Sequence, residues 1–203
     1  MPAYSFLTLK STGQGSYKEK GSKFLSFAYP VRTELHIKET IAALKSEYFD
    51  ARHHCYAWML GPEKNHFRAF DDGEPNHSAG DPILGQIRAR NLTNVLVVVV
   101  RYFGGTKLGV GGLIAAYKSA AEDALNNCAV IEMEVMERVT LNYDYSVTSD
   151  VMKLVKDFDI SIISQEFMDQ CFLTADLPLR HRDKFNEKIK LLNDLGVPVS
   201  YVK

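Results

Sequence analysis

The sequence predicts an α+β protein of two domains, and three observations support this fold class. The 203 residues are 46% hydrophobic and 24% charged, as in ordinary globular proteins. Strand-like and helix-like patterns alternate along the first 134 residues. In residues 135–203 the predicted strands and helices follow the order βαββαβ. The acidic stretch 132–137 lies between the two parts and is predicted to be a linker. We therefore expect an N-terminal α/β sandwich domain over residues 1–134 and a ferredoxin-like domain over residues 135–203.

The first domain begins with a predicted strand over residues 17–31, where aromatic and polar residues mix. Thr33 is a favourable N-cap for a helix that continues to Tyr48. The next predicted strand covers residues 52–60, and residues 67–70 are expected to return antiparallel to it.

A second helix is expected to start with Asp81 as its cap and Pro82 at its first position. Residues 94–103 are almost continuously apolar and predict a strand buried at the centre of the sheet. A long helix follows the glycines after this strand. Its predicted packing face repeats at helical spacing and consists of Leu113, Tyr117, Ala120, Ala121 and Ala124.

The second domain is expected to contain four strands and two helices. The strands are predicted at residues 139–145, 160–167, 171–177 and 197–202, and the helices at residues 148–158 and 180–195. Phe185, Ile189 and Leu192 form one apolar stripe on the last helix, and Gly196 is its natural stop.

The overall charge excludes a strongly basic or acidic polyelectrolyte. Lys and Arg number 24 and Asp and Glu number 25, so the formal net charge is -1. Both halves are close to neutral, and any nucleic-acid site must be a local patch. The longest apolar run, residues 95–100, is too short for a membrane span of roughly 20 residues. With no secretory signal and three scattered cysteines, we expect a cytoplasmic protein without membrane contact.

A glycine-rich segment carries the strongest functional signal. It contains five glycines between a predicted strand and a predicted helix, namely Gly104, Gly105, Gly109, Gly111 and Gly112. Such a segment can turn backbone N–H groups toward an anion at the helix N-terminus. It is not a Walker loop, because Val110 and Gly111 stand where Lys and Ser or Thr are required. The alternative is that the glycines only permit tight turning and close packing.

Cationic and aromatic side chains flank this segment. Arg101, Tyr102, Phe103 and Lys107 could hold phosphates or stack bases. On a strand, Arg101 and Phe103 share one face while Tyr102 takes the other, so at most two of these three side chains cooperate. The alternative is the ordinary end of a core strand with a solvated Arg.

A second group of polar residues allows a metal or acid/base site. Asp71, Asp72 and Glu74 could bind a hard cation, but the spacing favours a tight turn. His53 or His54 could pair with one of the two Asp residues as a general base. Adjacent residues on a strand point to opposite faces, so a single site can recruit only one of these His residues. No catalytic residue, metal or cofactor is predicted.

The motifs DDGEP (71–75), AGDP (79–82) and VVRYFGGTKLGVGGL (99–113), with ARHHCYAW (51–58), closely resemble the IMPACT family in its bacterial two-domain form. The chain departs from the family at residues 76–78, where a small residue, Gly and Thr are usual. The resemblance implies an N-terminal domain similar to domain IV of elongation factor G and to a domain of a small-subunit ribosomal protein. It implies a C-terminal domain similar to domain V of that factor.

The resemblance assigns no catalytic residue. Eukaryotic relatives carry an additional RWD module and regulate translation by competing for the activator of the kinase that phosphorylates initiation factor 2. Because this chain starts directly at the IMPACT domain, we do not expect that partnership. We expect a non-enzymatic regulatory module that binds RNA or ribosomal components. The alternatives are an enzyme acting on a phosphorylated or nucleotide substrate through a His–Asp pair, and a protein-binding regulator with an exposed apolar patch on the ferredoxin-like sheet.

Overall fold

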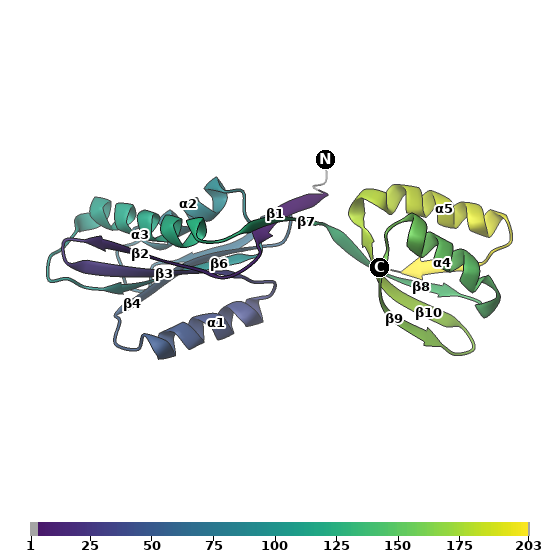
Figure 1. Cartoon of the computed structure of the whole chain (residues 1–203), viewed down its shortest axis with the longest axis horizontal. Helices are drawn as coiled ribbons and strands as arrows, with labels where there is room; N and C mark the ends of the chain where they lie inside the picture. The colour runs from purple at the N-terminus through teal and green to yellow at the C-terminus, as the bar shows by residue number, and fades with distance from the viewer. Residues whose placement is uncertain (1–3, 203) are drawn as a thin grey trace. The chain divides into compact units, whose positions relative to one another are not determined.

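The computed structural model describes residues 4–202, and contacts divide them into two compact units (Figure 1). The N-terminal unit comprises residues 6–133, and the C-terminal unit comprises residues 134–202 with residues 4 and 5. Both units mix helices and strands, which confirms the predicted α+β class. The assignment of separate domains with a boundary after residue 134 stays a prediction. No helix within residues 4–202 is long and apolar enough to cross a bilayer.

A five-stranded antiparallel sheet forms the centre of the N-terminal unit. In spatial order its strands are β2 (Gly13–Glu19), β3 (Ser22–Pro30), β6 (Val95–Tyr102), β4 (His53–Leu60) and β5 (His66–Phe70). The prediction of one strand over residues 17–31 is wrong, because the chain turns at Lys20 and Gly21 and forms the β2–β3 hairpin. Both turn residues have positive φ, 46° and 79°, as a tight hairpin requires.

Helices cover both faces of this sheet (Figure 1). Helix α1 (Glu34–Glu47) lies on one face, and α2 (Gly80–Ala89) and α3 (Gly109–Asn126) lie on the other. The predicted N-cap of α1 is confirmed, since Thr33 Oγ1 accepts a hydrogen bond from the His36 backbone N–H at 3.2 Å. All five residues predicted for the packing face of α3 are buried.

Strand β6 is buried on both sides, as its apolar run predicted. Alternate residues such as Val97 and Val99 join the core under α2 and α3, while Val98 and Val100 join the core under α1. Its neighbours β3 and β4 both run antiparallel to it. The continuous apolar run therefore reflects helices on both faces rather than a parallel sheet.

The predicted linker over residues 132–137 contains the division between the two units, after residue 133, but it is not irregular in structure. These residues belong to β7 (Val130–Glu134) and β8 (Met136–Tyr143). Strand β7 pairs with β1 (Ser5–Leu9) in a separate two-stranded sheet, which the Lys10 N–H extends by a 2.8 Å hydrogen bond to the Ala129 carbonyl. Acidic residues at alternate positions of β7 are exposed, so their charge did not exclude a strand.

The C-terminal unit has the predicted βαββαβ order. Its antiparallel sheet has the strand order β11-β8-β10-β9, and its further elements are α4 (Thr148–Asp157), β9 (Ser161–Phe167), β10 (Cys171–Pro178), α5 (Arg182–Asp194), β11 (Val199–Val202) and the 3-10 turns Tyr145–Val147 and Leu179–His181. Core residues Leu154 of α4 and Phe185 of α5 pack with Leu173 of β10. Some of the unit's exposed apolar side chains lie on or directly after the edge strand β9, namely Ile162, Ile163, Phe167 and Met168.

Candidate functional site

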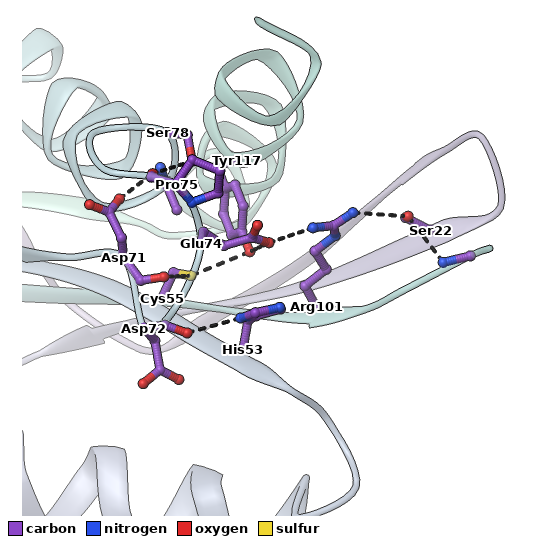
Figure 2. A network of polar contacts seen from close by, with 12 residues as sticks. Ser22, His53, Cys55, Asp71, Asp72, Glu74, Pro75, Ser78, Arg101 and Tyr117 are labelled. Carbon is purple, nitrogen blue, oxygen red and sulfur yellow. Dashed lines mark hydrogen bonds and ion pairs between the residues drawn. The ribbon is translucent and has the colours of Figure 1, made fainter. Parts of the chain in front are cut away.

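The sequence-predicted site residues lie at one end of the N-terminal unit's sheet. Because the strands are antiparallel, this end contains the β2–β3 turn, the start of β4, the end of β6 and the loop that follows β5. Residues 104–112, the glycine loop, leave β6 at the same end and lead into α3, and residues 71–78, the acidic loop, connect β5 to α2. The sheet therefore brings together all three predicted groups of residues, as Figure 2 shows for the buried part.

A buried ion pair joins the glycine loop's strand to the acidic loop. Arg101 Nη1 lies 2.6 Å from Glu74 Oε1, and the two side chains are only 6% and 4% exposed. The same carboxylate oxygen accepts a 2.8 Å hydrogen bond from the Tyr117 hydroxyl of α3. Arg101 Nη2 lies 3.5 Å from Ser22 Oγ, so its guanidinium is held on two sides (Figure 2). Its Nε has no hydrogen-bond partner among the described residues.

The strand alternation predicted for residues 101–103 is correct. The Arg101 guanidinium carbon lies 5.4 Å from the centroid of the Phe24 ring and 5.7 Å from that of Phe103, on the face that α3 covers. Tyr102 instead donates a 2.7 Å hydrogen bond to Asp50, which follows α1 on the opposite face. This bond to the carboxylate raises the pKa of Tyr102 to about 12. Phe103 remains 51% exposed, whereas Arg101 is buried.

The glycine loop contacts the β2–β3 turn through backbone atoms. A Cβ on Gly104 would lie 1.8 Å from the Gly21 carbonyl carbon, so only glycine fits at position 104. The Gly104 N–H donates to Ser22 Oγ at 3.2 Å and joins the loop to the Arg101 contacts. By contrast, a Cβ on Gly111 would meet nothing within 4 Å. Close packing therefore accounts for Gly104 but not for every glycine of the loop.

The start of α3 leaves backbone donors available. Leu108 is its N-cap residue and makes no side-chain capping bond, and Gly109, which has φ +71°, is exposed. Gly105 also has positive φ and open space around it, and Gly112 is half-buried. The uncapped N–H groups of a first helical turn carry partial positive charge, which is the environment that attracts an anion.

Five cationic side chains surround this end of the sheet, and we call them the cationic end. All five are exposed and lack an acidic partner within 4.0 Å in the described part of the chain; they are Lys18, Lys20, Lys23, Arg52 and Lys107. Two nearby carboxylates, of Glu19 and Asp50, accept hydrogen bonds from tyrosine hydroxyls.

Sequence reasoning selected only Lys107 among the five cationic residues. Lys18 and Lys23 are direct cross-strand neighbours, and Lys20 stands in the turn between them. The signal that could have found them is the sequence Lys20-Gly21, which favours a turn and splits the predicted strand into a hairpin.

The acidic loop uses its carboxylates to hold its own backbone. Asp71 accepts hydrogen bonds of 2.8 to 2.9 Å from the backbone N–H groups of His77, Ala79 and Gly80. Burial alone would raise the pKa of Asp71, but these three bonds together hold it below its ordinary value. Asp71 thus does the capping predicted for Asp81, because α2 begins at Gly80, one residue before Asp81.

The loop is therefore the turn that its spacing favoured. Among residues 4–202, no three His, Cys, Asp or Glu side chains gather as they do around a metal ion. His77 has φ +64°, and it stands where the family that the sequence resembles usually has glycine. The loop thus keeps a left-handed backbone there, and its N–H contact with Asp71 supports that conformation.

The two adjacent histidines face opposite sides of the sheet, as predicted. His53 Nδ1 lies 2.9 Å from the backbone carbonyl of Asp72 (Figure 2), so this contact does not involve the carboxylate. His54 Nδ1 is 4.0 Å from the Asp72 carboxylate, beside Lys45 of α1. Burial lowers the pKa of His54, which Asp72 partly opposes. The structure therefore does not pair the His53 side chain with the carboxylate of Asp71 or Asp72, whereas the exposed side chains of His77 and Asp81 do meet at 2.6 Å.

The remaining nucleophilic group in the network is Cys55. Its Sγ lies 3.3 Å from the Tyr117 hydroxyl oxygen and 3.0 Å from the Asp71 carbonyl oxygen, the two acceptors within reach of its single S–H proton. Burial raises the pKa of the Cys55 thiol well above its ordinary value, and burial likewise raises the pKa of Tyr117. Because the thiolate is the reactive form of cysteine, this environment suits packing rather than nucleophilic attack.

Comparison with known proteins points to one family. A model described as the Impact N-terminal domain matches residues 20–125, which include the β2–β3 turn, the acidic loop and the glycine loop. The chain is 36% identical to the IMPACT family member YvyE of Bacillus subtilis over 70% of its own length and 66% of YvyE. It is 30% identical to an IMPACT family member of Haemophilus influenzae over 91% of its own length and 90% of that protein.

The fold also matches a solved structure described as the crystal structure of an hypothetical protein, with a TM-score of 0.77 at 27% identity. The match covers 99% of this chain and 98% of that chain.

Proposed function

The chain belongs to the IMPACT family, and from that premise we propose that it is a non-enzymatic module which binds RNA or ribosomal components and takes part in regulating translation. The binding surface is the end of the N-terminal unit's sheet. Phosphate groups contact the cationic end and the N–H groups of the glycine loop, at Gly104, Gly105, Gly109, Gly111 and Gly112. The three free cysteines support the cytoplasm as its location.

The observation that carries this proposal is the group of five cations that have no acidic partner within 4.0 Å in the described part of the chain. Lys18 and Lys23 lie directly opposite one another on neighbouring strands, an arrangement of like charges that destabilises a sheet unless an anion neutralises them. Lys20 and Lys107 lie in the two loops that touch through Gly21 and Gly104. A polyanion that crosses this end would relieve the repulsion, and each neutralised phosphate would release counterions.

Arg101 takes a different role from the one its sequence position suggested. Its guanidinium is buried against Glu74, so a phosphate could reach it only by breaking that pair. We assign Arg101 and Tyr102 to the support of the surface, and Phe103 and Lys107 to contact with the ligand. The His53, His54, Asp71, Asp72 and Glu74 side chains hold the acidic loop and the strand ends, so we do not base an enzyme proposal on them.

The test compares two triple variants with equal loss of charge. One variant, Lys20→Gln/Lys23→Gln/Lys107→Gln, removes three cations from the binding surface. Its matched control, Lys184→Gln/Lys188→Gln/Lys190→Gln, removes three from α5 of the C-terminal unit. We expect only the first variant to weaken binding of a labelled uridine oligomer in fluorescence anisotropy. Its plot of log affinity against log salt should become shallower by about 2, because three phosphate contacts are lost from a single strand.

Equal losses in the two variants would contradict a local site and indicate a nonspecific charge effect. Unchanged affinity and salt slope in the first variant would overturn the assignment of the surface. A pull-down from lysate with and without nuclease then separates the partners, since RNA-mediated recovery of ribosomal subunits is lost on nuclease treatment.

A further inference from the structure

Phe103 has an exposed aromatic ring that contacts a buried side chain of the protein. It is the first residue after β6 and is 51% exposed. The guanidinium carbon of the buried Arg101 lies 5.7 Å from its ring centroid, within the range of a cation–π contact. A buried cation against the ring, with half of the side chain open to solvent, leaves apolar surface available for a ligand.

Hydrogen bonds fix the backbone and the neighbours of this ring. Glu74 and Ser22 hold the Arg101 guanidinium, two residues before Phe103. Ser22 Oγ also accepts the N–H of Gly104, the residue that follows Phe103. Both sides of Phe103 are therefore tied to the same buried network, which limits its movement. A ring ordered before binding loses little entropy when a ligand stacks on it.

Unpaired cations lie in the loops next to this ring. The Gly21 and Gly104 backbones are in contact, so the turn with Lys20 adjoins the loop with Lys107. Both lysines are exposed, and neither has an acidic partner within 4.0 Å among residues 4–202. An aromatic ring beside unpaired cations is the combination that binds single-stranded nucleic acids: the ring stacks a base and the cations bind the flanking phosphates.

We propose that Phe103 is a stacking platform for an unpaired nucleobase, and that the ligand of this surface is single-stranded RNA rather than a duplex. The inference rests on the proposed function and specifies its ligand. A base within a duplex is already stacked on its neighbours and is not free to cover the ring. Arg101 is a positioning residue here: it acts on the ligand only through Phe103.

The test replaces the aromatic ring without changing charge. In Phe103→Leu we expect the affinity for a uridine oligomer of about 12 nucleotides to fall about 5- to 150-fold, the range for loss of one base–aromatic stack. The salt slope should not change, because no phosphate contact is lost. Phe103→Trp should keep the affinity, and its indole fluorescence should be quenched on binding. Affinity for an RNA duplex of similar length should be the same in wild type and Phe103→Leu.

A matched control is Phe67→Leu on β5. Phe67 is also exposed, at 44%, and has the Arg88 guanidinium 4.4 Å from its ring, but it lies toward the other end of β5 from the acidic loop. This control should bind like wild type. Wild-type affinity for the oligomer in Phe103→Leu, together with loss in the lysine variant, would overturn the stacking platform while the proposed function survives. Failure of wild type to bind either RNA would overturn both the stacking platform and RNA binding by this surface.

Discussion

The two units differ in how deeply they bury an ion pair. The N-terminal unit has a buried pair, Arg101 with Glu74, besides surface pairs such as Lys45 with Asp72. In the C-terminal unit Arg138 and Asp176 pair at 2.6 Å at the surface, where the two side chains are 61% and 29% exposed. Both halves are close to neutral in composition. The number of charges therefore does not distinguish the two units, whereas the burial of their ion pairs does.

The sheets of the two units also differ in how much of their surface is covered. Helices cover both faces of the N-terminal unit's sheet, which explains why β6 is buried along its length. In the C-terminal unit the core lies on one face, and the edge strand β9 is exposed at every residue. The exposed Ile162, Ile163 and Phe167 of this strand are the feature expected of the protein-binding alternative, which stays a prediction. The binding chemistry of the two units is thus predicted to differ: polar and cationic in the first, apolar in the second.

The largest expected effect comes from breaking the buried ion pair. Arg101→Met leaves the Glu74 carboxylate buried without its cation, and we expect the N-terminal unit to lose about 3 to 5 kcal/mol of unfolding free energy. Fluorescence of Trp58 measures this, because the only tryptophan is buried in that unit. The double variant Arg101→Met/Glu74→Leu should recover part of the loss, since it leaves no unpaired charge.

The matched change in the C-terminal unit is Arg138→Met. We expect little or no change in its unfolding, followed by circular dichroism, because exposed pairs are screened by water and salt. A similar loss from both variants would contradict the contrast between buried and surface pairs.

A smaller effect is expected from two glycines that differ in their surroundings. Gly104→Ala forces a Cβ against the Gly21 backbone and should cost about 1 to 3 kcal/mol, as for overpacking of a tight contact. Gly111→Ala meets open space in the first turn of α3 and should be neutral or stabilising. Urea unfolding monitored by Trp58 distinguishes the two. Equal losses of unfolding free energy in the two variants would mean that the contact between the glycine loop and the β2–β3 turn does not require glycine at position 104.

The smallest expected effect concerns the carboxylates that cap backbone N–H groups in each unit. Asp71→Ala should cost about 1 kcal/mol, as loss of a capping side chain does. The folded-state pKa of Asp71 is lowered, so its contribution is present above the unfolded value of 3.8 and is lost as the pH falls through the lower folded value. The gap between wild-type and variant stability should therefore close in acid.

Asp144 offers the comparison in the C-terminal unit. Hydrogen bonds from the Ser146 side chain and backbone N–H lower its pKa, but the carboxylate is fully exposed. Asp144→Ala should show the same sign of pH dependence with a smaller amplitude. A larger effect at Asp144 than at Asp71 would reverse the expected order of the two units.

Local patterns in the sequence predicted most of the elements. The spacing of Leu113 and Tyr117, the cap at Thr33 and the order of elements after residue 139 all depend on neighbouring residues, and the structure confirms them. The β2–β3 hairpin was missed because the turn at Lys20 and Gly21 interrupts a run that otherwise reads as one strand.

The site depends on contacts that sequence spacing does not specify. Arg101 was predicted to face phosphates because it flanks the glycine loop. Its position in the chain gives no sign of Glu74, which is 27 residues away and is brought beside it by the sheet. Lys107 likewise joins the lysines of the β2–β3 hairpin only through the contact between Gly21 and Gly104, which are far apart in the chain. Residue types indicated the chemistry of this end of the sheet, whereas the fold determined which cations remain available.

The two-stranded sheet of β1 and β7 has a consequence for folding during synthesis. Strand β1 ends at Leu9 and its partner begins at Val130. At a synthesis rate of about 5 to 20 residues per second, β1 has no partner strand for roughly 6 to 24 s after it has been made. The N-terminal unit therefore cannot complete its fold during the first half of translation. Exposure of an unpaired apolar strand over this interval makes the nascent chain, more than the finished protein, the form that is open to aggregation and to chaperone binding.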